Sequence, residues 1–508
     1  MNAYDVAIIG GGLAGNLVAR QLRRQLPDLS VAVFEKARRP HYKVGESTVE
    51  IASHYLVRRL GLSRYLYEQQ LPKNGLRFFF DTEARDGELT QLSEMGSTAF
   101  GYLPSFQVDR ARLEVDMRAM NAADGVELLD GRVKALDVET GRFEVLDEAG
   151  VRRPAQARYV IDASGRAGVI AKRRGLWQPR QHAIGAAWGR FRGVVDMDDL
   201  GPESWRARVN HTSRVMSTNH FCYPGYWIWF IPLGGGLTSV GVVIDKAQWT
   251  PSMQQAEGFQ AFLGQHRAVA ELLAPAQLVD VLSYRQLAYG SAQYLGPGWA
   301  CIGEAAAFSD PLYSPGSDFI ALENDFVVDL VGRELAGEDV TERRAAYDAF
   351  LAFRYEATMR LYERLYGTLG SYELYRLKWF FDIGCYYDLW LEPYMRDEHL
   401  DLGWLRRQLK QRELVLGVLA RFRDLFLEAE AEMRGSGRYF TKNIGRFTGA
   451  FPTMQSASGL GSDDSSRRAL ARAAETFNLT RREAMVLLER PASADLSMRH
   501  FLSGKPLL

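Results

Sequence analysis

The chain has 508 residues, of which 47% are hydrophobic and 24% are charged. This is the composition of an ordinary globular protein, and it excludes a disordered or fibrous chain. At about 100–200 residues per domain, the length allows about two to four domains. The 62 basic residues balance the 62 acidic residues, so the formal net charge is zero and no overall basic field favours a nucleic-acid partner.

The sequence carries no recognisable metal-binding or targeting pattern. Cys222, Cys301 and Cys385 are far apart and form no CxxC pair, which excludes a cysteine-rich zinc site and a disulfide framework. The eight histidines show no HxxxH or HExxH spacing, so no metal site is predicted. The glycines from Gly10 leave no room for a signal peptide, and no stretch approaches the roughly 20 apolar residues of a membrane span. We expect a cytoplasmic protein.

A strand, a glycine turn, a helix and a second strand open the chain. Residues 4–9 read as a short buried strand, and Gly10, Gly12 and Gly15 follow as GxGxxG. A helix and a second strand then lead to Glu35, which lies 20 residues after Gly15. The glycines make a tight turn, let the backbone approach a pyrophosphate and let the helix pack on the strand, while the acid binds a ribose diol. The segment therefore predicts a dinucleotide-binding βαβ unit.

Three later segments favour FAD over NAD as the dinucleotide. Residues 106–113 resemble the strand-to-helix segment of two-domain flavoproteins, with Arg110 as its basic residue, and residues 159–165 form a buried strand that ends in DASG. Residues 299–306 contain GEAA, which is similar to a third flavin motif of these proteins, with Glu304 where Asp is usual. The predicted cofactor-binding residues are Gly10, Gly12, Leu13, Ala14, Gly15, Glu35, Lys36, Ser47, Arg110, Asp162, Gly165, Gly303, Glu304, Asp310 and Gly316.

No second GxGxxG unit follows, so the chain lacks a nicotinamide domain of its own by sequence. We expect the reduced flavin to come from a separate reductase or directly from the substrate. Gly234, Gly235 and Gly236 lie between two strand-like runs and predict a hairpin turn instead.

The predicted fold class is α/β. We expect a Rossmann-type FAD-binding domain of the glutathione-reductase and p-hydroxybenzoate-hydroxylase type, an inserted β-sheet substrate domain and a helical C-terminal region. Residues 50–69 read as helical and the alternation over residues 126–157 as antiparallel strands. The aromatic stretch 362–394 is either a packed helical core, which we favour, or a hydrophobic wall for an aromatic substrate.

The predicted boundaries divide the chain into three parts. The first is an FAD-binding module over 1–330. It contains the βαβ unit at 1–50, the DASG turn at 159–165, the inserted antiparallel sheet at about 181–290 and the GEAA motif at 303–306. A helical substrate-covering region over 331–454 and a linker with a helical tail over 455–508 follow.

Three local motifs go beyond FAD binding in general. They are KVGEST at residues 43–48, LPKNG at 71–75 and WIWFIP at 227–232, which fits WxWxIP without a mismatch. Together they resemble the flavin-dependent halogenases, the tryptophan-halogenase-like enzymes of the FAD-dependent monooxygenase superfamily. The resemblance covers about the first 330 residues. WxWxIP is the most specific of the three motifs, because tryptophan is rare and two are held at a fixed spacing.

The resemblance implies a chemistry for these residues. In the family, reduced FAD and oxygen turn a halide into hypohalous acid, which moves through a tunnel to a lysine beside the organic substrate. Lys73 is the candidate lysine, either as an ammonium that orients the halogen or as a neutral amine that forms a haloamine. Trp227, Trp229 and Pro232 would then wall the flavin off from the substrate, although two tryptophans on one face also suit a half-buried strand.

The loop over residues 310–318 departs from the family pattern. In halogenases this region supplies backbone N–H groups for chloride, and the family usually has Ser or Thr where this chain has Pro315, which lacks an N–H. Gly316 and Ser317 remain as candidate halide donors. Tyr313 stands where tryptophan-type halogenases carry a glutamate, which favours a phenol, a pyrrole or a carrier-tethered substrate over an indole.

Three functions remain open from the sequence. The first is halogenation of an electron-rich aromatic ring (a phenol, pyrrole or indole) with chloride or bromide. The second is a halide-independent flavoprotein monooxygenase or oxidase of the same fold, which Pro315 and Tyr313 suggest and which includes action on a polypeptide. The third is a non-catalytic flavin-binding assembly protein. The expected partners are the aromatic substrate, halide, a flavin reductase and a carrier protein or polypeptide, with neither nucleic acid nor membrane.

Overall fold

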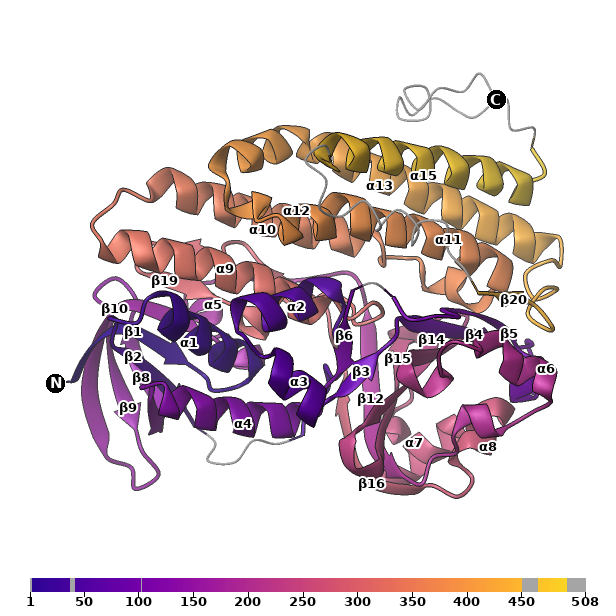
Figure 1. The fold of residues 1–508 in the computed structure, drawn as a ribbon, viewed down its shortest axis with the longest axis horizontal. Helices are drawn as coiled ribbons and strands as arrows, with labels where there is room; N and C mark the ends of the chain where they lie inside the picture. The colour runs from indigo at the N-terminus through magenta and orange to yellow at the C-terminus, as the bar shows by residue number, and fades with distance from the viewer. Residues whose placement is uncertain (1, 37–41, 102, 450–464, 491–508) are drawn as a thin grey trace.

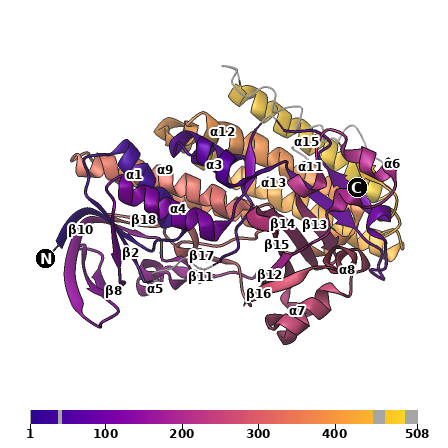
Figure 2. The same ribbon diagram turned by 60° about the horizontal axis from the view of Figure 1, so that its bottom comes forward.

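The computed structural model describes residues 2–36, 42–101, 103–449 and 465–490. The predicted linker, residues 455–466, falls almost entirely outside these residues. Within the described part of the chain, two large β-sheets lie at opposite ends of the molecule, and long helices run along one side of both (Figure 1). The view in Figure 2 keeps the same two ends apart. No helix among the described residues is long and apolar enough to cross a bilayer.

The first sheet carries the βαβ unit. Its strand order is β18-β19-β10-β1-β2-β7, with β9 paired to β10 and β8 paired to β9. The pairs among β19, β10, β1, β2 and β7 are parallel, as the βαβ connection requires. The strands are β1 (Asn2–Ile9), β2 (Val31–Glu35), β7 (Glu127–Asp130), β8 (Arg132–Asp137), β9 (Arg142–Leu146), β10 (Arg152–Asp162), β18 (Leu295–Gly296) and β19 (Trp299–Cys301).

The second sheet has the order β16-β12-β15-β14-β13-β4-β5-β20. Its core is the predicted antiparallel insertion, and the Gly234–Gly236 turn joins β14 to β15 as expected. Its members are β4 (Leu76–Phe80), β5 (Ser93–Gly96), β12 (Ile184–Arg192), β13 (Thr218–Tyr223), β14 (Tyr226–Leu233), β15 (Leu237–Asp245), β16 (Gln277–Tyr284) and β20 (Phe447–Thr448). Two small antiparallel pairs join β3 (Leu71–Lys73) to β6 (Ser105–Gln107) and β11 (Trp177–Pro179) to β17 (Tyr289–Ser291).

Helices pack on the sheets and against one another. The first part of the chain has α1 (Leu13–Gln25), α2 (Glu50–His54), α3 (Ser63–Gln69), α4 (Arg110–Ala123), α5 (Val169–Arg173), α6 (Glu203–Arg206), α7 (Ala256–Leu263) and α8 (Arg267–Leu273). The layer along the long side in Figure 1 has α9 (Pro315–Leu335), α10 (Thr341–Arg360), α11 (Tyr372–Cys385), α12 (Glu392–Met395), α13 (Leu402–Gly435) and α15 (Ser465–Leu487). Buried apolar side chains of these helices and of the first sheet form one continuous core.

Three details differ from the sequence prediction. The helix expected over residues 50–69 is interrupted by a π-helical turn at Tyr55–Arg59 and a break at Gly61, whose φ of 65° is left-handed. Strand β7 pairs parallel with β2, so the expectation of antiparallel strands throughout 126–157 is wrong for this segment. The second sheet also recruits β4, β5 and β20 from outside the predicted insertion, and β4 pairs parallel with β13.

Candidate active site

A cavity of about 890 Å³ opens at the carboxyl ends of β1 and β2 and at the start of α1. This is the edge at which doubly wound sheets bind dinucleotides. The predicted cofactor-binding residues that line it are Gly10, Gly12, Leu13, Ala14, Glu35, Lys36, Arg110, Gly165 and Glu304. All four sequence segments that the FAD motifs had singled out therefore contribute to this cavity.

Two of the three motif glycines leave no room for a side chain at this edge. Gly10 has a φ of 107°, and a Cβ there would lie 2.4 Å from the Ala163 carbonyl oxygen. A Cβ on Gly15 would lie 1.9 Å from the Gly10 carbonyl oxygen, which is the close helix–strand packing expected of the third glycine. A Cβ on Gly12 would meet only Lys43 Nζ, at 3.5 Å, so its free face is open toward the cavity. This backbone cradle fits a pyrophosphate.

Charged side chains of both signs complete the cavity wall. The Glu35 carboxylate accepts a hydrogen bond from the Gly11 N–H at 2.7 Å, which holds the acid at the end of β2 beside the glycine turn. Arg110 and Lys43 both bind Glu114, at 2.6 and 3.0 Å. Burial raises the pKa of Glu114, but these two cations more than offset it and the pKa lies below its usual value. Burial raises the pKa of Glu304 in spite of nearby Arg166 and Arg110.

Several predicted cofactor residues do not line the cavity but stabilise the backbone around it. The Asp162 carboxylate accepts hydrogen bonds from the N–H groups of Ser164 and Ile170 and so closes the DASG turn. The Gly303 N–H donates to buried Glu323 at 2.5 Å. Gly15 belongs to the same group, because it packs against Gly10.

Asp310 is held away from the flavin cavity by three contacts. Its Oδ2 lies 2.7 Å from His182 Nε2 and accepts a hydrogen bond from the Tyr366 hydroxyl, also at 2.7 Å. Its Oδ1 accepts a hydrogen bond from the Leu312 N–H at 2.9 Å. Asp310 therefore fixes the start of the loop that leads to Tyr313 and Pro315.

A second cavity, of about 80 Å³, contains Lys73 and is called the lysine pocket below. Its walls come from residues 49–50, from β3, β4, β6 and the residue after β5, and from helices α9 to α11 with the π-helical turn Tyr386–Leu391. The lining residues are Val49, Glu50, Lys73, Gly75, Leu76, Ser97, Ser105, Tyr313, Pro315, Asp318, Arg354, Thr358, Leu361, Tyr362, Trp379, Asp382, Ile383, Tyr386, Tyr387 and Trp390. Much of this wall comes from the aromatic stretch 362–394, so that stretch is both a helical core and a pocket wall.

Lys73 ends strand β3 and is only 4% exposed. Its Nζ donates to the Ser47 hydroxyl and to the Thr48 carbonyl oxygen, each at 2.8 Å. Burial lowers its pKa to about 8, although Glu50 and Asp318 act in the opposite direction. An ammonium has three donors, so one N–H remains for a molecule in the pocket. Ser47, which the sequence placed at the cofactor, lies beside this lysine and does not line the flavin cavity.

Trp227 and Trp229 lie in a hydrophobic cluster that has members in the walls of both cavities. Their side chains point to the same face of β14 and belong to one hydrophobic cluster. This cluster includes Val44, which lines the flavin cavity. It also includes Tyr362 and Trp379, which line the lysine pocket. The Trp227 N–H donates to the Tyr366 hydroxyl at 3.1 Å, and the Trp229 N–H donates to Ser239 at 3.2 Å. Pro232 lies near the end of the same strand, paired with Thr238, and lines neither cavity.

The predicted halide loop ends at the first turn of α9. Ser314 precedes the helix with a left-handed φ of 56°, and Pro315 is its first residue and lines the lysine pocket. Gly316 is exposed, and Ser317 is half-buried with a hydroxyl that has no hydrogen-bond partner among the described residues. Because the N–H groups of a first helical turn have no partner within the helix, Gly316 and Ser317 keep donors for an anion despite the proline.

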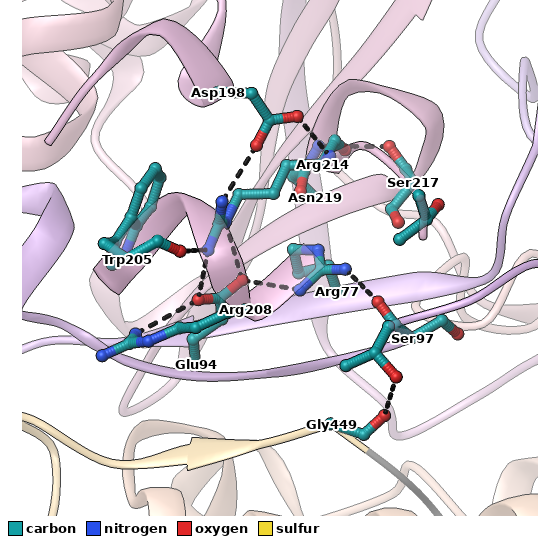
Figure 3. A network of polar contacts seen from close by, with 12 residues as sticks. Arg77, Glu94, Ser97, Asp198, Trp205, Arg208, Arg214, Ser217, Asn219 and Gly449 are labelled. Carbon is teal, nitrogen blue, oxygen red and sulfur yellow. Dashed lines mark hydrogen bonds and ion pairs between the residues drawn. The ribbon is translucent and has the colours of Figure 1, made fainter. Parts of the chain in front are cut away.

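A buried ionic network supports the strand that follows Lys73 (Figure 3). Glu94 on β5 is fully buried and binds Arg77 at 2.6 Å, Arg214 at 2.8 Å and Arg208 at 3.2 Å. Arg77 also donates to the carbonyl oxygen of Ser97, which lines the lysine pocket. The network therefore fixes one wall of the pocket through backbone groups.

Comparison with known proteins decides the family. The model of the tryptophan halogenase family matches residues 5–80 and 81–367 of this chain. The chain belongs to the tryptophan halogenase family. It is an FAD-dependent oxidoreductase, and the flavin-dependent halogenases are its family, as the motifs had indicated.

Two curated relatives of this family are similar over much of their length. The flavin-dependent halogenase chlA of Dictyostelium discoideum is 28% identical over 438 residues, which cover 79% of this chain and 72% of that protein. The 1H-pyrrole-2-carbonyl peptidyl-carrier-protein brominase of Pseudoalteromonas luteoviolacea is 25% identical over 354 residues, which cover 66% of this chain and 79% of that protein.

Solved halogenase structures share the fold. The flavin-dependent brominase Bmp2 superposes with a TM-score of 0.59 at 25% identity, over 80% of this chain and 93% of that one. The halogenase PltM has a TM-score of 0.68 at 19% identity and covers 95% of this chain and 97% of its own. The second match extends the likeness of fold from the halogenase motifs into the helical C-terminal region.

The family motifs did not identify part of the lysine pocket. Asp382, Trp379 and Arg354 line it, and all three lie in the helical region, where the sequence offered no halogenase motif. The one available signal was the density of aromatic residues over 362–394, a stretch that also contains Asp382. No group of three or more His, Cys, Asp or Glu side chains in the described part of the chain is arranged to hold a metal ion.

Proposed function

We propose that this chain halogenates an electron-rich aromatic molecule held in the lysine pocket, with reduced FAD, oxygen and chloride or bromide as co-substrates. Bound reduced FAD with oxygen would supply the oxidising power that converts halide to hypohalous acid. The residues that would hold it are the glycine turn, Glu35, Arg110 and Glu304 around the larger cavity. Because the sequence has no second GxGxxG unit that could bind a nicotinamide cofactor, a separate reductase would supply the reduced FAD.

The observation that carries this proposal is the position of Lys73. A buried lysine with one free donor lies in an aromatic-lined pocket that shares no lining residue with the flavin cavity. An ammonium there donates to the oxygen of hypohalous acid and so makes the halogen more electrophilic toward the ring beside it. A pKa near 8 keeps most of the side chain protonated near pH 7. Oxygen transfer directly from the flavin would need the substrate next to the larger cavity.

Pro315 favours a second candidate, a halide-independent monooxygenase or oxidase. It removes one backbone donor from the loop in which the family binds chloride, and this weakens the case for a halide site there. The donors of Gly316 and Ser317 support halogenation over this alternative. Relatives that act on a pyrrole bound to a peptidyl carrier protein, and a relative solved with phloroglucinol, make a carrier-bound or free electron-rich ring the substrate class to try first.

The test is a product assay with and without halide. The protein receives FAD, a flavin reductase, NADH and a panel of phenols, pyrroles and indoles, with chloride, bromide or neither, and the products are analysed by mass spectrometry. Products with a chlorine or bromine isotope pattern are expected only when that halide is present. Hydroxylated or dehydrogenated product in equal amount with and without halide would overturn the proposal in favour of the second candidate.

A further inference from the structure

Asp382 lines the lysine pocket and has one carboxylate oxygen without a hydrogen-bond partner among the described residues. It lies on α11, is 3% exposed and lines the same cavity as Lys73. Its Oδ2 accepts a hydrogen bond from the Tyr313 hydroxyl at 2.6 Å and binds the Lys378 ammonium. Its Oδ1 is buried, and no group of the described residues donates to it. A buried carboxylate oxygen without a donor is costly, so its place in a cavity wall points to a donor that arrives with a ligand.

The contacts of Oδ2 hold the carboxylate in one orientation. The Tyr375 hydroxyl donates to the Tyr313 hydroxyl at 3.1 Å, and Tyr313 in turn donates to Asp382. Burial raises the pKa of Tyr313 well above its ordinary value, so this phenol stays protonated and remains a donor. Lys378 lies one helical turn before Asp382 and is itself 1% exposed, so its ammonium neutralises the carboxylate inside the protein. Tyr313 and Lys378 are positioning residues for Asp382.

We propose that Asp382 accepts the O–H of a phenol in the lysine pocket and is the base for that phenol during halogenation, which makes the substrate class phenolic. This inference rests on the proposed halogenation. It assigns the pocket two functional ends, with Lys73 toward the halogen donor and Asp382 toward the substrate hydroxyl. The aromatic walls, which include Tyr362 and Trp379, lie around the same cavity and suit a flat ring.

The proton and electron balance of the step is as follows. The phenol proton moves to Asp382 Oδ1, and the ring carbon forms a bond to the halogen of hypohalous acid. The halogen–oxygen bond breaks, its electron pair leaves with the oxygen, and the Lys73 ammonium protonates the resulting hydroxide to water. The Lys73 amine then takes the ring C–H proton, which restores aromaticity and regenerates the ammonium. Asp382 returns its proton to the phenolate. The sum is an aryl halide and water from the arene and hypohalous acid.

Acidity distinguishes a phenol from an indole or a pyrrole at this site. A phenol has a pKa of about 10, as tyrosine does, whereas an indole or pyrrole N–H is far less acidic. Burial raises the pKa of Asp382, although Lys378 and Tyr313 act in the opposite direction. The rise brings the pKa of this carboxyl closer to the pKa of a phenol. A carboxylate base therefore matches a phenol and would leave a pyrrole N–H in place.

The test measures binding, so it does not depend on whether halogenation occurs. Isothermal titration calorimetry on the FAD-loaded protein compares 4-methylphenol with 4-methylanisole, in which a methyl group replaces the O–H proton. The wild-type protein is expected to bind the phenol about tenfold or more tightly, the range of a hydrogen bond to a charged group. In Asp382→Asn this preference is expected to fall to about twofold or less, with the affinity for the anisole unchanged.

Two variants separate the proposed contact from a general loss of structure. Asp388→Asn alters another buried aspartate of the same helical region, which is paired with Arg472 at 3.0 Å and does not line the pocket, so the preference should persist. Tyr313→Phe removes a donor to Oδ2 but leaves Oδ1 in place, so a reduced preference for the phenol should remain. A wild-type protein that binds the phenol no better than the anisole, or binds neither, overturns the proposal. So does an Asp382→Asn protein that keeps the full preference.

Discussion

The two cavities are built from the chain in different ways. The flavin cavity opens over a glycine turn whose backbone faces it, and this turn lies within one short sequence segment. The lysine pocket is lined by side chains that come from segments as far apart as Val49 and Trp390. A backbone cradle needs particular glycines and tolerates variation around them. A side-chain pocket depends on packing across the whole molecule. Short sequence motifs therefore predict the glycine turn of the flavin cavity but do not predict the lysine pocket.

The largest expected effect comes from breaking the ionic network that supports the pocket wall. Glu94→Gln leaves Arg77 buried without its counter-charge and Arg214 with Asp198 alone, and it is expected to lower the free energy of unfolding by about 3–5 kcal/mol. Differential scanning calorimetry of the FAD-loaded protein measures this loss. The matched control is Glu88→Gln, which breaks an exposed pair with Arg267 and should cost about 1 kcal/mol or less. Equal effects of the two changes would contradict the structural role of Glu94.

A glycine pair tests whether the flavin cavity is a backbone cradle. Gly12→Ala adds a Cβ that meets only Lys43 Nζ at 3.5 Å, so the protein should fold, but its affinity for FAD should fall about tenfold or more because the methyl group faces the cavity. Fluorescence titration with FAD measures this loss. Gly417→Ala is the control, since a Cβ there meets nothing within 4 Å on α13. If Gly12→Ala binds FAD with unchanged affinity, the pyrophosphate does not bind at this turn.

The pH dependence of halogenation tests the protonation state of Lys73. Its pKa is lowered to about 8, so the ammonium is present below that pH and is lost as the pH rises through it. If the ammonium is the working form, the halogenation rate should fall by about tenfold per pH unit above pH 8. Oxidation of the reduced flavin in the same samples is the control and should not follow this titration. A rate that rises through pH 8 would assign the role to the neutral amine.

The sequence predicted the parts of the site that short motifs encode. Gly10, Glu35 and Glu304 line one cavity, and Lys73 lies in the other, because a turn, a strand end or a strand pair fixes each locally. Asp382 was missed because its contact with Tyr313 joins residues 69 positions apart and belongs to no motif. Ser47 was expected at the cofactor and lies instead on Lys73, since the buried 46–48 segment runs between the two cavities.

The fold shows the same limit. The βαβ unit and the hairpin at Gly234–Gly236 follow from local patterns and were confirmed. The pairing of β4 with β13 brings together strands more than 130 residues apart in sequence, and no period within either strand specifies a partner at that distance. The roles of Trp227 and Trp229 stay predictions, although the hydrophobic cluster that contains them includes residues from the walls of both cavities.

The most direct test of the central claim compares the wild-type protein with Lys73→Ala in the halide-dependent product assay. FAD binding is measured on both proteins, because Lys73 does not line the flavin cavity and the variant should retain it. We expect a chlorinated or brominated product from the wild type and at least about a hundredfold less from the variant, the scale of losing a positioned catalytic donor. A Lys73→Ala protein that binds FAD and halogenates at the wild-type rate would contradict the account.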